Sequence, residues 1–232
     1  MLADQEMKQV QRGLFIVFEG LDRSGKSTQS QRVAKYFQEE LQRKVQNISF
    51  PNRDTKGGKI LNDYLQNREQ KLNDRAVHVL FSFNRWEMQP EIIEILKNGT
   101  NLICDRYAFS GVAYSAAKGL DFEWCKNSDR GLIQPDLTFF IDVKPETIQQ
   151  RGNFGDERYE RFEFQSKVSK VYDSFKQDYR DSKHWITIEG ENKTREQVTE
   201  EILNKITAYE NDVMPLLDFD KMAESLFMEG KQ

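Results

Sequence analysis

Apolar runs of strand length alternate with segments of helical periodicity along most of this chain. Five of these runs are short and rich in apolar, β-branched or aromatic residues, and they cover residues 14–19, 45–50, 101–104, 137–143 and 185–188. The run at 137–143 is apolar almost without interruption, which is typical of a parallel strand covered on both faces. The pattern therefore predicts five strands separated by helices.

The segments between these runs predict helices at residues 27–42, 60–66, 74–88 and 162–179, and helices that begin at Pro145 and near Thr194. In the first helix, Val33, Phe37 and Leu41 share one face. Pro90 is expected to kink or restart the third helix, and Gly99 is expected to cap its end.

Turn and cap signals bound several of these elements. Pro51 stops the second strand because proline lacks the N–H that a central strand uses, and residues 51–59 are expected to form a loop. Thr194 and Gln197 form a capping box for the last helix. The buried stripe of that helix is predicted to be Val198, Ile202 and Ile206. Strands and helices in alternation imply a parallel sheet with helices on both faces.

The loop between the first strand and the first helix carries the most specific chemical signal. Its sequence GLDRSGKST, residues 20–28, fits a phosphate-binding P-loop: a glycine, four residues, then Gly-Lys-Ser/Thr between a strand and a helix. Gly20 and Gly25 allow backbone N–H groups to approach phosphate oxygens, and the helix N-terminus adds its positive dipole end. Lys26 is expected to reach the terminal phosphates of ATP, and the Ser27 hydroxyl to ligate Mg²⁺. A glycine-rich turn with a chance lysine is the alternative, and the flanking elements argue against it.

Charged residues recur where the chain is expected to reach the carboxyl edge of the sheet, or a helix that faces it, and open parallel sheets bind ligands at this edge. The arginines at such positions are Arg23, Arg53, Arg85 and Arg106. Any one of them is equally compatible with a solvated surface position. Together they would suit two phosphorylated ligands, because a donor and a phosphorylated acceptor each need positive charge.

Other candidates have two open readings. Asp105 follows the third strand and either caps the next turn or organises Mg²⁺ or the nucleophile. Phe81 and Tyr114 either pack in the core or form a wall that stacks on a base. His78 and His184 are expected to be structural, so that no catalytic histidine is predicted.

Composition limits the partners. A chain of 232 residues suits one α/β domain, expected here over residues 1–232. The formal charge of -4 and a pI near 5.5 provide no global basic field for nucleic acid or an anionic membrane. No transmembrane helix or signal peptide is visible. Cys104 and Cys125 lack metal-ligand spacing and are expected to be free thiols in a reducing compartment, by default the cytoplasm, with the nucleus left open.

Several stretches together resemble eukaryotic-type thymidylate kinase. The matching stretches are FEGLDRSGKSTQ (18–29), FPNR (50–53), LFSFNRWE (80–87), DRYAFSGVAYS (105–115), QPD (134–136) and RGNFGDERYE with the following FQ (151–165). The resemblance implies a nucleoside monophosphate kinase of the P-loop NTPase type: an α/β three-layer fold with a five-stranded parallel sheet. It also implies transfer of the γ-phosphoryl group of ATP to dTMP with Mg²⁺, giving dTDP and ADP in dTTP biosynthesis. A homodimer formed through the helices at residues 74–98 is a further implication.

The resemblance assigns the donor side. The implied ATP-binding residues are Gly20, Arg23, Ser24, Gly25, Lys26, Ser27, Thr28 and Lys193. Arg23 is expected to reach the phosphoryl group in transfer, because an arginine inside the P-loop marks the eukaryotic type. Lys193 lies in the loop where the family holds adenine. The implied catalytic residues are Arg23, Lys26, Asp105 and Arg106, and the implied metal ligands are Ser27 and Asp105.

The resemblance also assigns the acceptor side. Arg53 and Arg106 are expected to grip the dTMP phosphate, and Asp22 to accept a hydrogen bond from the deoxyribose 3′-hydroxyl. Phe81 is expected to stack on thymine while Arg85 reads its edge. The residues implied to close the pocket are Tyr114, Tyr159 and Gln165. Residues 151–161 are the implied lid, which excludes water so that ATP is not hydrolysed.

Two other classes of protein share parts of the pattern. A GTPase-like switch would use residues 54–57 and Asn192-Lys193, but Arg195 stands where an aspartate must bind the guanine base. A deoxynucleoside kinase has an acceptor without a phosphate, and the pair Arg53 and Arg106 argues against it. Comparing dTMP with thymidine as acceptor separates the two kinase interpretations.

Overall fold

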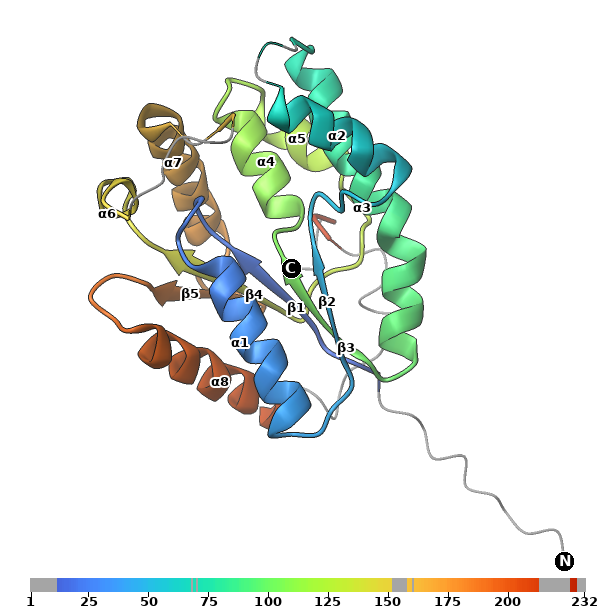
Figure 1. The fold of residues 1–232 in the computed structure, drawn as a ribbon, viewed down its shortest axis with the longest axis vertical. Helices are drawn as coiled ribbons and strands as arrows, with labels where there is room; N and C mark the ends of the chain where they lie inside the picture. Colours follow the sequence, from blue (N-terminus) through green and yellow to red (C-terminus); the bar gives the residue numbers. More distant parts are fainter. Residues whose placement is uncertain are drawn as a thin grey trace, which may run out of the picture.

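Five parallel strands form one sheet through the middle of the molecule (Figure 1). They are β1 (Phe15–Glu19), β2 (Val45–Ser49), β3 (Asn101–Asp105), β4 (Leu137–Asp142) and β5 (Trp185–Glu189), in the spatial order β2-β3-β1-β4-β5. The structure is a computed structural model that describes residues 12–67, 69, 71–151, 158–159, 161–212 and 226–228. The predicted five-stranded parallel sheet is confirmed.

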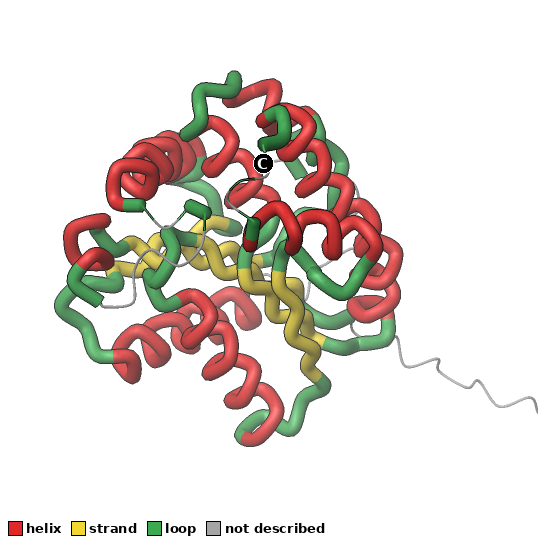
Figure 2. Tube along the Cα trace, turned by 45° about the horizontal axis from the view of Figure 1, so that its top comes forward, coloured by secondary structure: helices red, strands yellow, loops and turns green. Residues whose placement is uncertain are grey.

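Helices cover both faces of this sheet, which lies between two helical layers in Figure 2. One face carries α1 (Lys26–Glu39) and α8 (Arg195–Asp212), which pack against each other. The other face carries α3 (Asp74–Lys97), α4 (Ala108–Ala116) and α7 (Phe162–Asp178). The shorter helices α2 (Lys56–Gln66), α5 (Phe122–Asn127) and α6 (Pro145–Gln149) pack on α3, α4 and α7 respectively. The three-layer α/β fold is therefore as expected.

Strand β1 is central, and every residue of it is buried. It pairs in parallel with β3 and β4, with Phe18 opposite Asp105 and Glu19 opposite Phe140. Because all five strands run the same way, the loops that follow them emerge at one edge of the sheet. The P-loop and Arg106 consequently lie side by side.

The expectation of a loop over residues 51–59 is wrong in its second half, because α2 already begins at Lys56. Thr55 caps this helix, and its Oγ1 accepts a hydrogen bond of 3.0 Å from the Gly58 N–H. The glycines permit close packing: a Cβ at Gly58 would lie 1.7 Å from the Asn52 carbonyl oxygen. Glycine in this segment thus indicates a close approach of two backbones rather than a flexible loop.

Helix α3 continues through Pro90, so the predicted restart of the helix is wrong. An interior proline costs a helix about 3 kcal/mol. The last half of α3 also buries Met88, Ile92 and Leu96 in the core, and full burial of each such side chain is worth roughly 1.5–3 kcal/mol. Packing therefore outweighs the local cost. Helix α4 was not expected from the pattern, since its nine residues are mostly small and include Gly111.

Several local expectations are confirmed. Gly99, with φ of 72°, follows the end of α3. The Thr194 N–H donates to Gln197 Oε1 at 2.8 Å, and the Gln197 N–H donates to Thr194 Oγ1 at 3.2 Å, which is the capping box. The stripe Val198, Ile202 and Ile206 is buried. Cys104 and Cys125 are buried and free.

Both histidines have structural partners. His78 is buried, with Nδ1 at 2.8 Å from Ser115 Oγ and Nε2 at 2.9 Å from the Cys125 carbonyl oxygen. Burial lowers the pKa of His78, which favours the neutral ring. His184 Nδ1 lies 2.9 Å from the Asp136 carbonyl oxygen. In the part of the chain that the structure describes, no helix has the length and apolar character needed to span a membrane.

Candidate functional site

The P-loop has the backbone geometry that its sequence predicts. Gly20 and Gly25 have φ of 142° and 110°, which side-chain-bearing residues rarely adopt. A Cβ at Gly20 would also lie 2.7 Å from the Ile141 carbonyl oxygen, so only glycine fits. Helix α1 begins directly after Gly25, and the N–H groups of its first turn therefore lie at the sheet edge.

Lys26 is the buried cation of this loop. Its side chain is 4% exposed, and its Nζ donates to the Leu21 carbonyl oxygen. Burial, together with the positive charge of Arg106, lowers the pKa of Lys26 to about 8. The carboxylates of Asp105, Asp22 and Glu19 offset this lowering only in part, so an anionic ligand would further stabilise the buried ammonium group.

Ser27 and Asp105 meet at the start of α1. The Ser27 hydroxyl donates to Asp105 Oδ2, while Asp105 Oδ1 is buried and has no hydrogen-bond partner among the described residues. The reading of Asp105 as a cap for the following turn is not supported, because the Tyr107 and Ser110 N–H groups donate to Glu19 instead. A hydroxyl beside a carboxylate with an unpartnered oxygen fits a Mg²⁺ site completed by phosphates and water.

Arg106 stands at the centre of the sheet edge. Its backbone has φ of 68°, and its Nη1 donates to the Gly20 carbonyl oxygen at 3.0 Å. Its Nη2 forms an ion pair with Asp22 and donates to the Tyr114 hydroxyl at 3.2 Å. Burial alone would lower the pKa of Arg106, but Tyr114 and Asp22 more than offset it, and the pKa is raised well above its usual value. The guanidinium group therefore remains charged.

Asp22 is held from a second side by Gln165 of helix α7. Gln165 Nε2 donates to Asp22 Oδ2 at 2.7 Å, and the Asp22 N–H donates to Gln165 Oε1 at 3.1 Å. Gln165 is fully buried. Two P-loop contacts from a helix 143 residues away in sequence fix the direction of the carboxylate.

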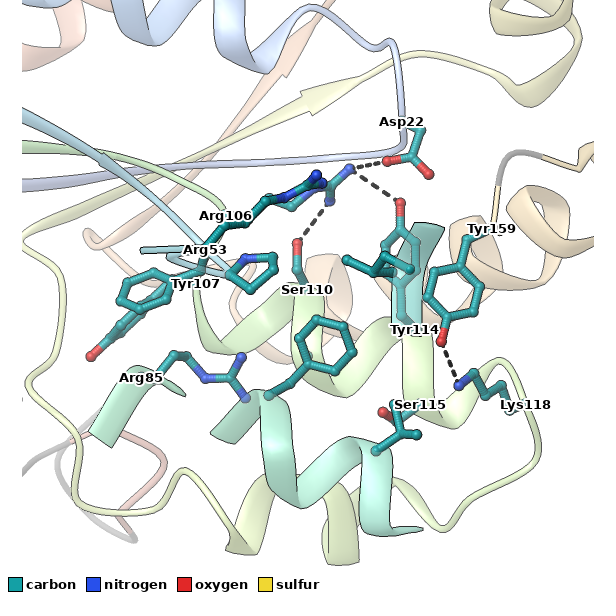
Figure 3. A pocket seen from close by; sticks show the side chains of 16 residues that line it. Asp22, Arg53, Arg85, Arg106, Tyr107, Ser110, Tyr114, Ser115, Lys118 and Tyr159 are labelled. Atoms are coloured by element: carbon teal, nitrogen blue, oxygen red, sulfur yellow. Dashed lines mark hydrogen bonds and ion pairs between the residues drawn. The ribbon is translucent and has the colours of Figure 1, made fainter. Parts of the chain in front are cut away.

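A cavity of about 150 Å³ opens beside these residues, between α2, α3, α4 and the P-loop (Figure 3). The predicted acceptor residues that line it are Asp22, Arg53, Phe81, Arg85, Arg106, Tyr114 and Tyr159. Gln165 does not line it but contacts Asp22 behind its wall. The structure therefore brings the predicted acceptor set to one place.

Arg85 is the most deeply buried of these cations. It is 2% exposed, and it forms two hydrogen bonds to the fully buried Asp129: Nε to Oδ1 at 3.0 Å and Nη2 to Oδ2 at 2.6 Å. The guanidinium plane packs on Gly111, where a Cβ would lie 2.6 Å from Nη2. This clamp leaves the guanidinium one orientation, with part of it on the cavity wall.

Arg53 reaches the cavity from the loop before α2, and its Nη1 donates to Asn62 Oδ1 at 3.0 Å. That loop is tied to α3: the Asn52 N–H donates to Asn84 Oδ1 at 2.7 Å, and Asn84 Nδ2 donates to Thr55 Oγ1 at 2.8 Å. The exposed Arg53 side chain therefore projects from a fixed backbone.

Tyr159, Tyr114 and Lys118 close the far end of the cavity. Lys118 Nζ donates to the Tyr159 hydroxyl at 2.7 Å and pairs with Asp74 at 3.0 Å. The Tyr159 hydroxyl donates to the Tyr64 hydroxyl at 3.1 Å, which connects it to α2. An aromatic wall with a cationic corner results.

A second cavity, of about 650 Å³, lies on the other side of the P-loop. The expected donor residues that line it are Arg23, Ser24, Gly25, Lys26, Ser27, Thr28 and Lys193. Gly20 does not line it and instead shapes the turn before it. Lys193 is paired with Glu201 at 2.8 Å, so its ammonium group is already engaged. This cavity is larger than the first and more open in the choice of ligand it could hold.

Several further residues at or behind these cavities had no individual role predicted from the sequence. Ser110 and Lys118 line the acceptor cavity, Asp129 orients Arg85, and Arg151 Nη1 donates to the Arg23 and Ser24 carbonyl oxygens at 3.0 and 3.2 Å. Ser110 and Arg151 lie within matched stretches, so their position was an available signal. Asp129 had none. Of the expected lid at 151–161, residues 152–157 and 160 lie outside the described residues.

Comparisons of this chain with protein families, with curated proteins and with solved structures all point to one family. The profile of the family described as Thymidylate kinase matches residues 18–202. The chain is 48% identical to a thymidylate kinase of Dictyostelium discoideum over 73% of this chain and 76% of that one. It is 40% identical to one of Caenorhabditis elegans, over 93% and 96% of the two chains. The solved structure of thymidylate kinase from Candida albicans aligns with a TM-score of 0.79 at 37% identity, covering 86% of this chain and 93% of that one.

Proposed function

We propose a residue-level account of phosphoryl transfer on the premise that this chain belongs to the thymidylate kinase family. The protein is accordingly an ATP:dTMP phosphotransferase, which produces dTDP on the route to dTTP. One observation carries the account: neighbouring residues of the P-loop line different cavities, Asp22 the smaller and Arg23 the larger. The loop is therefore the proposed meeting point of the two substrates.

On the donor side, ATP occupies the larger cavity with its phosphates on the P-loop. The first N–H groups of α1 and the Lys26 ammonium group bind the β- and γ-phosphates. Arg23 stabilises the negative charge on the γ-phosphoryl group in transfer. Lys193, which lines the same cavity, borders the adenine. Its ion pair with Glu201 limits it to a packing role.

Ser27 and Asp105 would hold Mg²⁺. The unpartnered Asp105 Oδ1 and the Ser27 hydroxyl supply the oxygen ligands that this ion prefers, and phosphates and water would complete the shell. When bound, the ion would neutralise charge on the donor phosphates.

On the acceptor side, Arg53 and Arg106 grip the dTMP phosphate and point one of its oxygens at the γ-phosphorus of ATP. That oxygen attacks, the bond from the γ-phosphorus to its bridging oxygen breaks, and ADP leaves. A phosphate monoester has a second pKa near 6, so at neutral pH the attacking oxygen is already deprotonated. The reaction therefore needs no general base, which fits two histidines with structural partners.

The remaining acceptor residues select and orient the nucleotide. Phe81 stacks on thymine, and Arg85, held by Asp129, donates to its edge. Asp22 accepts a hydrogen bond from the 3′-hydroxyl, in the direction fixed by Gln165. Tyr114 and Tyr159 enclose the sugar and base; their rings lie 5.8 Å apart.

Residues 151–161 are proposed to close over the substrates and exclude water. Two described residues support this. Tyr159 lines the acceptor cavity, and Arg158 Nε donates to the Tyr64 carbonyl oxygen of α2 at 3.0 Å. The segment therefore has anchor points on the helix that borders the acceptor, so that closure and acceptor binding support each other.

A homodimer is proposed to form through α3. Val79, Phe83 and Trp86 recur at helical spacing on this helix and are 49%, 50% and 38% exposed. Large apolar side chains in one stripe commonly mark a protein interface. The cytoplasm is the proposed location, since two buried free thiols suit a reducing compartment.

The experiment that tests the function is a coupled assay of ADP release across nucleoside monophosphates and thymidine. We expect activity with dTMP and none with thymidine, because a nucleoside lacks the phosphate that Arg53 and Arg106 bind. Equal rates with thymidine would indicate a deoxynucleoside kinase and would contradict the assignment of this arginine pair.

A further inference from the structure

Glu19 is a fully buried acidic residue at the carboxyl end of the central strand, directly before the P-loop. The phosphoryl-transfer account above gives it no role. A buried carboxylate is costly unless its oxygens are hydrogen-bonded. Its partners therefore indicate what it does.

Both carboxylate oxygens of Glu19 are saturated by donors from two helices. Oε1 accepts from the Tyr107 N–H at 2.8 Å and the Ser110 N–H at 3.1 Å. Oε2 accepts from Ser110 Oγ at 2.5 Å and from the Tyr172 hydroxyl at 2.9 Å. Tyr107, at the N-cap of α4, provides no side-chain cap, so Glu19 caps this helix from a neighbouring strand.

Ser110 connects this carboxylate to the acceptor cavity. A hydroxyl has one proton to donate, and here that proton lies in the 2.5 Å hydrogen bond to Glu19. Ser110 Oγ therefore faces Arg106 as an acceptor and receives Nη1 at 2.9 Å. Figure 3 shows this Ser110–Arg106 contact on the cavity wall.

The backbone of Arg106 depends on the same carboxylate. Arg106 has φ of 68°, in the left-handed region that side-chain-bearing residues adopt only when their surroundings hold them there. The next N–H along the chain, that of Tyr107, donates to Glu19, while the Arg106 N–H itself donates to the Phe18 carbonyl oxygen at 2.9 Å. Strand β1 thus holds the turn that presents Arg106.

We propose that Glu19 is a positioning residue for the acceptor phosphate, which sets the guanidinium of Arg106 through the Ser110 hydroxyl and the first turn of α4. Glu19 touches neither substrate. The inference rests on the proposed role of Arg106 in binding the dTMP phosphate. It predicts that changes at Glu19 or Ser110 weaken acceptor binding selectively, although Glu19 directly precedes the P-loop that binds the donor.

The substitution Glu19→Gln keeps the shape and reverses one contact. The amide oxygen can still accept the two backbone N–H groups, but the NH₂ group then faces Ser110 and Tyr172 as a donor. The Ser110 proton then loses Glu19 as its acceptor and can turn to the Tyr172 hydroxyl, 3.0 Å away, so that the Ser110 oxygen no longer keeps the orientation in which it accepts from Arg106. A hydrogen bond to a charged group is worth about tenfold or more in binding, so the KM for dTMP should rise about tenfold, with the KM for ATP within about twofold of wild type.

A double-mutant cycle and a matched control separate positioning from general stability. Ser110→Ala should also raise the KM for dTMP. The double variant Glu19→Gln/Ser110→Ala should have a KM for dTMP no higher than that of the poorer single variant, because both residues act on Arg106 through the same hydrogen bond. Tyr172→Phe removes a hydroxyl that contacts both Glu19 Oε2, at 2.9 Å, and Ser110 Oγ, at 3.0 Å, but it leaves the Ser110–Glu19 and Ser110–Arg106 hydrogen bonds in place. It should lower the melting temperature and leave the KM for dTMP within about twofold.

The outcomes are distinct. Additive effects of Glu19→Gln and Ser110→Ala, or an equal rise in both KM values, would overturn the inference. If Glu19→Gln does not fold, the KM values for dTMP of Ser110→Ala and Tyr172→Phe are compared instead. Equal values in these two variants would reject the positioning role. Arg106→Ala tests the premise, since an unchanged KM for dTMP there would reject the assigned role of Arg106 itself, whatever the Glu19 variants do.

Discussion

The buried ion pair between Arg85 and Asp129 allows a prediction about both stability and acceptor binding. Arg85 is 2% exposed and Asp129 is fully buried, so Asp129→Ala leaves an unpaired charge in the core. Breaking such a pair costs about 3–5 kcal/mol of unfolding free energy. For a chain of this size each kcal/mol shifts Tm by about 2–4 °C, so Tm should fall by roughly 6–20 °C. Asp129→Asn keeps one acceptor oxygen for Arg85, so its Tm should lie between those of Asp129→Ala and wild type.

The same variant should bind dTMP more weakly, because Asp129 fixes the orientation in which Arg85 meets thymine. A ligand at 100 times its Kd adds about 2.7 kcal/mol to stability. If Kd rises tenfold, the same dTMP concentration adds only about 1.4 kcal/mol. Denaturant unfolding with and without dTMP measures both quantities on one sample.

The control is Glu123→Ala, which removes a largely exposed carboxylate from its ion pairs with Lys126 and Arg130 and should cost about 0–1 kcal/mol. The reasoning fails if Asp129→Ala stays within about 1 kcal/mol of wild type. It also fails if dTMP stabilises the variant as strongly as it stabilises wild type.

Three further outcomes follow from particular contacts. Gly111→Ala places a Cβ 2.6 Å from Arg85 Nη2, and since Asp129 prevents that guanidinium from moving aside, the KM for dTMP should rise about tenfold in steady-state assays. Gly119→Ala has room for its Cβ but strains a backbone with φ of 97°, so it should lower the melting temperature and leave the KM for dTMP unchanged. Because the pKa of Lys26 is lowered to about 8, its ammonium group loses its proton as the pH rises through 8, and the affinity for ATP should fall above pH 8. At pH 8.5 the binding of ATP should therefore be accompanied by uptake of a proton, which calorimetry in two buffers of different ionisation enthalpy detects. Phe83→Glu should convert a dimer to a monomer in light scattering, and a dimer that persists would locate the interface elsewhere.

The sequence was sufficient where the signal is local. The P-loop pattern, the capping box and Gly99 each combine a residue type with a fixed offset, and all three have the expected geometry. Arg53, Arg85 and Arg106 also converge on one cavity, while Arg23 lines the other, because the loops after parallel strands emerge at one edge of the sheet. The fold class, and the gathering of the candidate site residues at two neighbouring cavities, were thus predictable from short segments.

Contacts between distant segments were not predictable. Asp129 lies 44 residues from Arg85 in a stretch that has the composition of a surface loop, and only the folded chain buries the pair. Glu19 looks like the polar end of a strand, although α4 and α7 saturate its carboxylate. Gly58 indicated a loop from its composition, whereas its role depends on the approach of the Asn52 backbone.

The division of labour within the P-loop is the central claim, and rapid-quench measurement of Arg23→Ala tests it most directly. With saturating ATP and dTMP, the rate of phosphoryl transfer should fall by a factor on the order of 10³ or more, because Arg23 stabilises the group in transfer. ATP binding should remain largely intact, and Arg53→Ala should by contrast raise the KM for dTMP. A near-normal transfer rate in Arg23→Ala would contradict the account.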